Sequence, residues 1–235
     1  EFRKAIEFFN QAIALDPNYA LAYAGLADAY NLLSNYGFTP PSEAVPKARE
    51  FARRALSLDA ELAEPHATLA GTLLSYDYDF AGAEREYRRA IELDPDYLPA
   101  HQWYGEMLTT VGRFEEAFAE YRRALEIDPL SLPVNWEYAR SLYHARKFDE
   151  SIAQHRKVFE LDVGFAVAHR TLAEVYRFKG DYAKAVEGHA RFYELNGEPQ
   201  NAALIREAFA KDGWKGYLRV VTAENSPLKF RHAIV

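Results

Sequence analysis

A short pattern recurs along the chain at a nearly constant spacing. A hydrophobic residue is followed by Asp or Asn and then by Pro or a residue in its place, and the triplets end at Pro17, Ala60, Pro95, Pro129, Val163 and Gly197. The intervals between them are 43, 35, 34, 34 and 34 residues. A period near 34 residues indicates stacked copies of one supersecondary unit. Because one unit cannot bury its own apolar face, the copies must pack on one another as an elongated solenoid.

Each period contains two helical patterns. Between residues 97 and 129, apolar and small residues from Pro99 to Leu108 recur three and four positions apart, which is helix periodicity. Gly112 interrupts this pattern. A second helical pattern runs from Phe114 to Leu125, and Pro129 prevents its continuation because proline lacks an N–H. The chain is therefore predicted to be all-α, built of antiparallel helix pairs.

Small and large residues recur at equivalent positions of the second helix. Small residues where two helices approach closely are Ala5, Ala48, Ala83, Ala117 and Ala185, and seven positions later Ala12, Ala55, Ala90 and Ala124. Ser151, Val158 and Phe192 replace alanine in later units, so the helix spacing is expected to widen there. Large apolar residues mark the start of this helix at Phe2, Phe80, Phe114, Phe148 and Tyr182.

These residues resemble the tetratricopeptide repeat, a 34-residue helix–turn–helix with the same small, large and proline pattern. The resemblance covers residues 2–197 and implies a right-handed superhelical solenoid of antiparallel helix pairs. It predicts an array over 1–199, made of the second helix of one unit and five full units, with a nine-residue insertion near 34–42. Capping helices are expected over 200–224, and an irregular tail over 225–235. Because the chain starts inside a helical pattern, we interpret it as a piece of a longer protein.

A narrower resemblance concerns the amino-acid sequence of the segments Leu93–Tyr104 and Gly112–Leu132. It is similar to repeat arrays of bacterial signalling proteins that follow a winged-helix, nucleotide cyclase or Ser/Thr kinase domain. The resemblance implies a sensory or regulatory segment of such a protein, and it does not choose among the three domains.

Composition excludes several functional classes. The net charge of −7 argues against nucleic-acid binding by this segment, because neutralising phosphates needs clustered Lys and Arg. The chain has no cysteine, so it can form neither a disulfide nor a thiolate zinc site. No apolar run reaches the roughly 18 residues of a membrane helix, so no membrane insertion by this segment is expected. The compartment cannot be read from these features, although a cytoplasmic location is favoured.

Candidate catalytic and metal sites are few. His66, His101 and His169 occupy one repeat position, which places them about 10 Å apart on neighbouring helices. A zinc ion needs its ligands within about 2 Å, so these histidines are interpreted as packing residues. No Gly-rich phosphate loop, GxSxG elbow or HExxH motif occurs. The prediction is a protein without catalytic activity, metal or cofactor.

The strongest site candidate is the inner face, which the first helices line in this repeat type. Positions spaced three and four apart place a mixture of aromatic, basic and acidic residues there, namely Gln102, Trp103, Glu106, Trp136, Arg140, Tyr143, Arg170, Glu174 and Arg177. Aromatic and Arg side chains are typical of binding hot spots. The competing interpretation is a solvated groove of internal Arg–Glu pairs.

Two known groove types of the family do not match. The carboxylate clamp of chaperone-tail receptors needs Lys and Asn, but the matching positions hold Ala24, Asp28, Ala67, Gly71, Gln102 and Glu106. The asparagine ladder of sugar-transferase arrays is missing as well. The predicted partner is a protein, bound as an extended peptide or a helix. A self-association module and a small-molecule sensor domain remain as alternatives.

Overall fold

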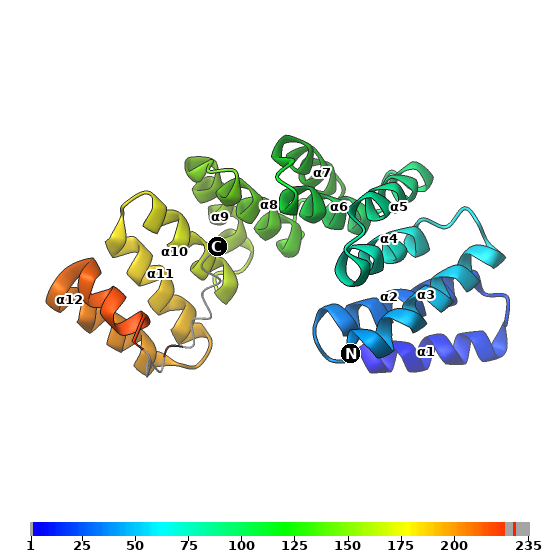
Figure 1. Cartoon of the computed structure of the whole chain (residues 1–235), viewed down its shortest axis with the longest axis horizontal. Coiled ribbons are helices and arrows are strands. Elements are labelled where there is room, and N and C mark those ends of the chain that lie inside the picture. The colour runs from blue at the N-terminus through cyan, green and yellow to red at the C-terminus, as the bar shows by residue number, and fades with distance from the viewer. Residues whose placement is uncertain (1, 224–227, 229–235) are drawn as a thin grey trace. The chain divides into compact units, whose positions relative to one another are not determined.

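The computed structural model describes residues 2–223 and 228 of the chain, and the regular secondary structure in these residues is helical (Figure 1). The helices are α1 (Phe2–Leu15), α2 (Ala20–Asn35), α3 (Pro41–Leu58), α4 (Ala63–Thr72), a π-helix η1 (Leu73–Asp77), α5 (Phe80–Leu93), α6 (Leu98–Thr110), α7 (Phe114–Ile127), α8 (Leu132–His144), α9 (Phe148–Leu161), α10 (Ala166–Phe178), α11 (Tyr182–Leu195) and α12 (Pro199–Val221). The predicted all-α class is confirmed.

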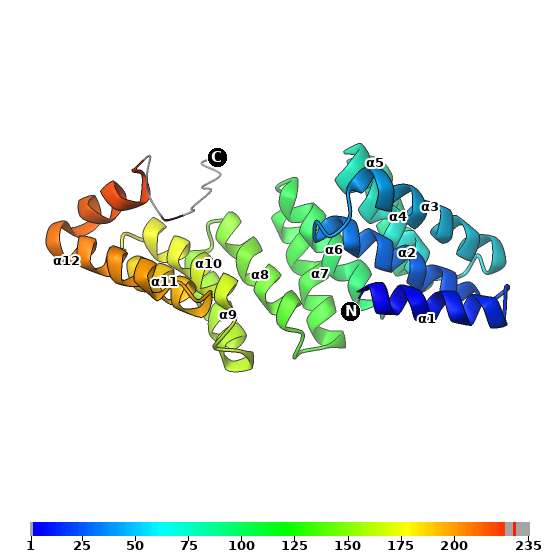
Figure 2. The same ribbon diagram turned by 90° about the horizontal axis from the view of Figure 1, so that it is seen from below.

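Successive helices pack as antiparallel pairs. The pairs are α2 with α3, α4 with α5, α6 with α7, α8 with α9, and α10 with α11. The chain divides into two compact units, residues 1–129 and 130–235, and each is described by itself. In the first unit α1, α2 and α3 lie side by side in both ribbon views (Figures 1 and 2). The boundary between the units follows Pro129, inside the predicted array.

The small residues of the second helices form the core, because two helix axes can approach closely only where side chains are short. Ala48, Ala83, Ala117 and Ala185 are fully buried, and so is Ser151 at the equivalent position of α9. The first helix differs. No residue of α1 is buried, so its two alanines at these positions are only partly covered.

The start of each second helix is a large apolar residue, as predicted. Phe2, Phe80, Phe114, Phe148 and Tyr182 are the first residues of α1, α5, α7, α9 and α11. Most turns before these helices contain a residue with positive φ two positions earlier. Gly112 and Gly180 have φ of 78° and 79° there, a backbone conformation that glycine adopts without steric penalty.

The predicted insertion is only partly a loop. Helix α2 continues to Asn35 and α3 begins at Pro41, so much of the extra length extends the two helices. The prediction of a loop from 34 to 42 was therefore too long, and the helix start lies at Pro41 instead of Ser42. Proline suits this first helical position because its missing N–H has no intrahelical partner there.

The rings of the insertion cover the start of α1. Phe2 stacks on Tyr36 with ring centroids 5.7 Å apart, and Phe38 lies 6.3 Å from Phe2. The insertion therefore contributes an aromatic cluster to the first unit.

The single extra residue of the 35-residue period is absorbed by the π-helix η1. A π-helical turn holds one residue more than an α-helical turn, so an inserted residue can be accommodated without breaking the helix. Tyr78 follows η1 in the left-handed conformation with φ of 56°.

Helix α12 packs against α11 in the second unit. Helix α12 is interrupted at Asp212 and Gly213, which have non-helical backbone angles, and Figure 2 shows the change of direction. Its two halves pack against α11 in a core that includes Ile205, Tyr217 and the isolated described residue Leu228. Most of the predicted tail, residues 225–227 and 229–235, lies outside the described residues.

Candidate functional site

The predicted inner-face residues come from three first helices. Gln102, Trp103 and Glu106 lie on α6 in the first unit, and the other six lie on α8 and α10 in the second unit. Among the six of the second unit, Trp136 contacts Arg140 and Glu174 pairs with Arg177. One cluster places an arginine over an aromatic ring, and the other is an ion pair between Arg177 and Glu174.

Trp136 and Arg140 form the first cluster, on α8. The Arg140 guanidinium lies 5.5 Å from the centre of the Trp136 ring and also donates to the Glu137 carboxylate, with Nε 2.8 Å from Oε2. The Trp136 indole N–H donates to Thr171 Oγ1 on α10 at 3.4 Å, and its ring meets Phe165 edge-on. Trp136 is half-buried, and it is oriented by Arg140 on its own helix and by Thr171 on α10.

Glu174 and Arg177 form the second cluster, on α10. Arg177 Nε donates to Glu174 Oε2 at 2.7 Å, and the other Glu174 oxygen lies 3.2 Å from His189 Nε2 on α11. Burial by itself would raise the pKa of Glu174, but His189 and Arg177 outweigh it and lower the pKa below its usual value. The carboxylate is therefore held ionised between two helices.

The remaining predicted residues of the second unit are Tyr143 and Arg170. Tyr143 is half-buried and lies 5.8 Å from the Phe178 ring, and burial raises its pKa. Arg170 is exposed and lies over the ring of Phe192 at 5.2 Å. Arg140 and Arg177 thus have carboxylate partners on their own helices, whereas Arg170 packs on an aromatic ring.

The predicted residues of the first unit form no comparable cluster. Gln102, Trp103 and Glu106 are each half-buried. A different residue of the first helices stands out instead. Asp28 on α2 has a buried carboxylate oxygen without a hydrogen-bond partner among the described residues, and burial raises its pKa to about 6. The sequence carries no signal for this, because the burial of a side chain cannot be read from the sequence alone.

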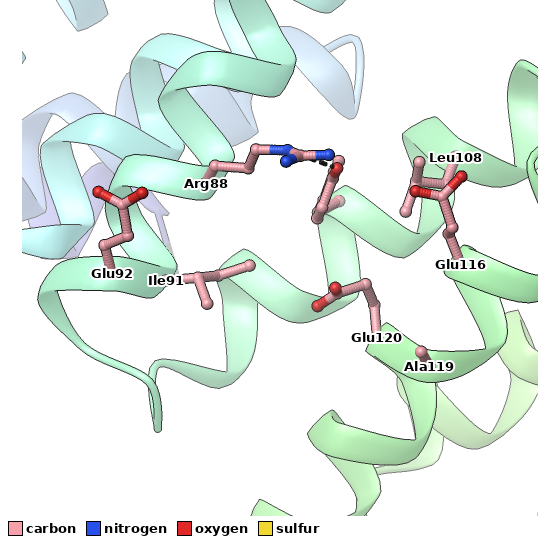
Figure 3. A pocket seen from close by; sticks show the side chains of 8 residues that line it. Arg88, Ile91, Glu92, Leu108, Glu116, Ala119 and Glu120 are labelled. Carbon is pink, nitrogen blue, oxygen red and sulfur yellow. Dashed lines mark hydrogen bonds between the residues drawn. The ribbon is translucent and has the colours of Figure 1, made fainter.

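A pocket of about 370 Å³ opens in the first unit between α5, α6 and α7 (Figure 3). Leu108 and Ile91 give it an apolar wall, and charged side chains come from α5 and α7, among them Arg88 and Glu120. These groups are already paired. Arg88 Nη2 lies 2.8 Å from Glu84, and Glu120 lies 2.6 Å from His101 Nδ1. The pocket is therefore large enough for a ligand, but most of its charged side chains are already paired with other residues of the protein.

Comparison with known proteins identifies the repeat. A family model described as tetratricopeptide repeat matches residues 68–131, and a second model with the same description matches residues 1–19. The chain carries tetratricopeptide repeats. No curated protein matches the chain significantly in sequence.

Solved structures share the tetratricopeptide-repeat fold. YrrB, a TPR protein with an unusual peptide-binding site, is 20% identical over 85% of this chain and 97% of its own, with a TM-score of 0.57. PilW, a widely conserved type IV pilus biogenesis factor, is 23% identical over 86% and 90%, with a TM-score of 0.67. PilF of Pseudomonas aeruginosa is 20% identical over 85% and 93%, with a TM-score of 0.65. At these identities the similarity shows the fold alone.

The histidines at the shared repeat position contact a neighbouring helix, two of them through a carboxylate. His66 and His101 each lie within 2.7 Å of a glutamate on the following helix, and His169 stacks on Phe159 with ring centroids 4.3 Å apart. Among residues 2–223 and 228, no three His, Asp or Glu side chains are grouped so as to hold a metal ion. In the same residues, no helix is long and apolar enough to cross a membrane.

Sequence reasoning missed a second aromatic site, at the turn between α8 and α9. Tyr143, His144, Arg146, Phe148 and Phe178 line a pocket of about 160 Å³. Only Tyr143 was a predicted site residue. One sequence signal points to this pocket: Arg146 occupies the turn position at which two other repeats have glycine, namely Gly112 and Gly180.

Proposed function

We propose that this segment is a non-catalytic scaffold that binds a peptide or helix of another protein on the first helices of the second unit. The observation that supports the proposal most directly is the cluster of Trp136 and Arg140, whose side chains are held in place by α8 and α10. A ring and a guanidinium that are already oriented lose little conformational freedom on binding. Exposed Arg170 lies on the same pair of helices and can grip a carboxylate of the partner.

The finer role follows from the sequence resemblance to bacterial signalling arrays. We propose that the scaffold is the regulatory segment of a larger signalling protein, in the cytoplasm. The peptide-binding description of YrrB supports a peptide partner, because the two proteins share a fold.

A random peptide library displayed on phage tests the proposal. Peptides selected on the immobilised chain are synthesised and titrated against the protein and against Trp136→Ala and Arg170→Ala. Each variant is expected to weaken binding at least about tenfold, because hot-spot side chains contribute about 2 kcal/mol or more and about 1.4 kcal/mol corresponds to tenfold. Arg156→Ala, which removes an exposed arginine from α9, is the matched control and should bind normally. Unchanged affinity of both inner-face variants with intact helicity would reject the assignment.

Self-association is a second candidate function, favoured by the first helix. On α1, Phe8 and Leu15 are 57% and 89% exposed, and exposed apolar surface promotes association. Light scattering over a range of concentrations tests this candidate. A second copy on α1 predicts a mass that rises with concentration and falls again in Phe8→Glu, whereas a constant monomer mass contradicts it.

A further inference from the structure

The turn between α8 and α9 carries an arginine in an unfavourable backbone conformation. Arg146 has φ of 61°, in the left-handed region. Gly112 and Gly180 occupy the same position in two other turns, with φ of 78° and 79°. A side chain at this position clashes with the backbone and costs about 1–2 kcal/mol, which glycine avoids. Such residues gather where their side chains serve a function.

The side chain of Arg146 places a positive charge beside an aromatic pocket. Its guanidinium lies 5.8 Å from the centre of the Phe178 ring, which belongs to the next helix pair. Phe178 also stacks on Phe148 at 6.0 Å and contacts Tyr143 at 5.8 Å. Despite these contacts, Phe178 remains 45% exposed. Together with His144, the three rings and the guanidinium line a pocket that is open to a partner.

The size and charge of the pocket restrict its occupant. Its volume of about 160 Å³ is close to the roughly 150 Å³ of a cavity that holds benzene, so one aromatic ring fits. No carboxylate lines it. Two nearby carboxylates are engaged elsewhere, because Glu174 pairs with Arg177 and Asp149 with Lys179.

A cationic occupant is disfavoured. The Phe178 ring already has Arg146 and Arg177 beside it, the latter at 4.3 Å, so a further cation would meet like charges. Among the described residues, no ion pair of Arg146 is found. A carboxylate beside the occupying ring would supply that pair, and charge-assisted hydrogen bonds to arginine are the strong ones.

We propose that the pocket of Tyr143, Phe148, Phe178 and Arg146 binds an aromatic side chain flanked by an acidic residue in a segment of a partner protein. This inference rests on the proposed function, because it takes the occupant of the pocket to be a segment of a partner protein. It adds a separate site, at the α8–α9 turn, and states the chemistry of the partner.

Two synthetic peptides test the proposal. One carries the tripeptide aspartate–phenylalanine–aspartate between glycine and serine, and the other has asparagine in place of both aspartates. Binding is followed by NMR, through the ring protons of Phe178 and the side-chain N–H of Arg146. The acidic peptide should shift these signals in a saturable way, and its affinity should fall with added salt. The asparagine peptide should bind about tenfold more weakly.

Substitutions of residues with a left-handed backbone conformation provide the test variants and their matched control. Arg146→Gly removes the cation and relieves the backbone strain, so it should fold normally and lose about tenfold in affinity. Arg146→Lys keeps the charge and should retain most of the binding. Tyr78→Gly relieves the same kind of strain at the turn after η1, in the other unit, and should bind like the original protein.

Three results would overturn the proposal. They are the absence of saturable shifts with the acidic peptide, equal affinity of Arg146→Gly, and equal or tighter binding of a lysine–phenylalanine–lysine peptide. Trp136→Ala separates this site from the inner face. If Trp136→Ala loses the library-selected peptides but still binds the acidic peptide, the inner face and the pocket are two independent sites.

Discussion

Acid should destabilise the second unit through His155. This side chain lies on α9 and is fully buried, and its Nδ1 lies 2.8 Å from the Ser151 carbonyl oxygen. Its Nε2 has no hydrogen-bond partner among the described residues. Burial lowers the pKa of His155 from 6.5 to about 4, and His169 on α10 adds to the effect in the same direction.

The sign and size follow from proton linkage. Between pH 6.5 and about 4 the unfolded chain binds a proton that the folded chain does not, so the folded state loses stability as the pH falls through this window. A shift of this size corresponds to about 3 kcal/mol in full, of which about 2 kcal/mol is already lost near pH 5. Well above pH 6.5 the group is neutral in both states and contributes no pH dependence.

NMR and urea unfolding check this prediction. The ring proton signal of His155 should titrate with a midpoint near 4, far below an ordinary histidine. Unfolding by urea at about pH 7 and about pH 5 should then show a loss that is about 2 kcal/mol smaller in His155→Leu than in the original chain. A Trp103→Phe background restricts the fluorescence to Trp136 and Trp214 of the second unit. A midpoint near 6.5, or equal acid sensitivity of the two chains, would refute the reasoning.

Three further predictions concern packing, charge and turn geometry. Gly188→Ala should destabilise the chain by about 1–3 kcal/mol in urea unfolding, because a Cβ there would lie 2.9 Å from Ala173 Cβ on the facing helix. Glu84→Gln should cost about 1–2 kcal/mol near pH 7, because the hydrogen bond from Arg113 lowers the pKa of Glu84 to about 2. The difference from the original chain should shrink as the pH falls from 4.5 toward 2, which unfolding at several pH values measures. Tyr78→Gly should leave the melting temperature unchanged or raise it, since φ of 56° suits glycine; a clear drop would contradict this.

Much of the fold was predictable because it depends on local patterns. The period of the triplets located the helix pairs, and Phe80, Phe114 and Phe148 marked helix starts to the residue. The extra residues were harder. Sequence placed one near Tyr76, but whether it makes a loop or a π-helical turn depends on how α4 and α5 pack, which a pattern does not contain.

The candidate site was predicted in part. The spacing of four residues predicts Trp136 and Arg140 on one face of the helix, and in the structure the Arg140 guanidinium lies 5.5 Å from the centre of the Trp136 ring. The partners that orient them come from other helices, as Thr171 does for Trp136. Such contacts could not be predicted, because they depend on the distance and rotation between helix pairs.

The sequence by itself determined the all-α class, the repeat period and which residues of each helix are small enough for close packing, because these follow from spacing along one chain. Only the tertiary structure decided that Phe178 stays partly exposed beside Arg146, that His155 Nε2 has no partner in the part of the chain that the structure describes, and that Glu174 is held between Arg177 and His189. Each of these depends on residues from different helices meeting in space. Burial and charge pairing arise from that meeting, and they decide what the surface can bind.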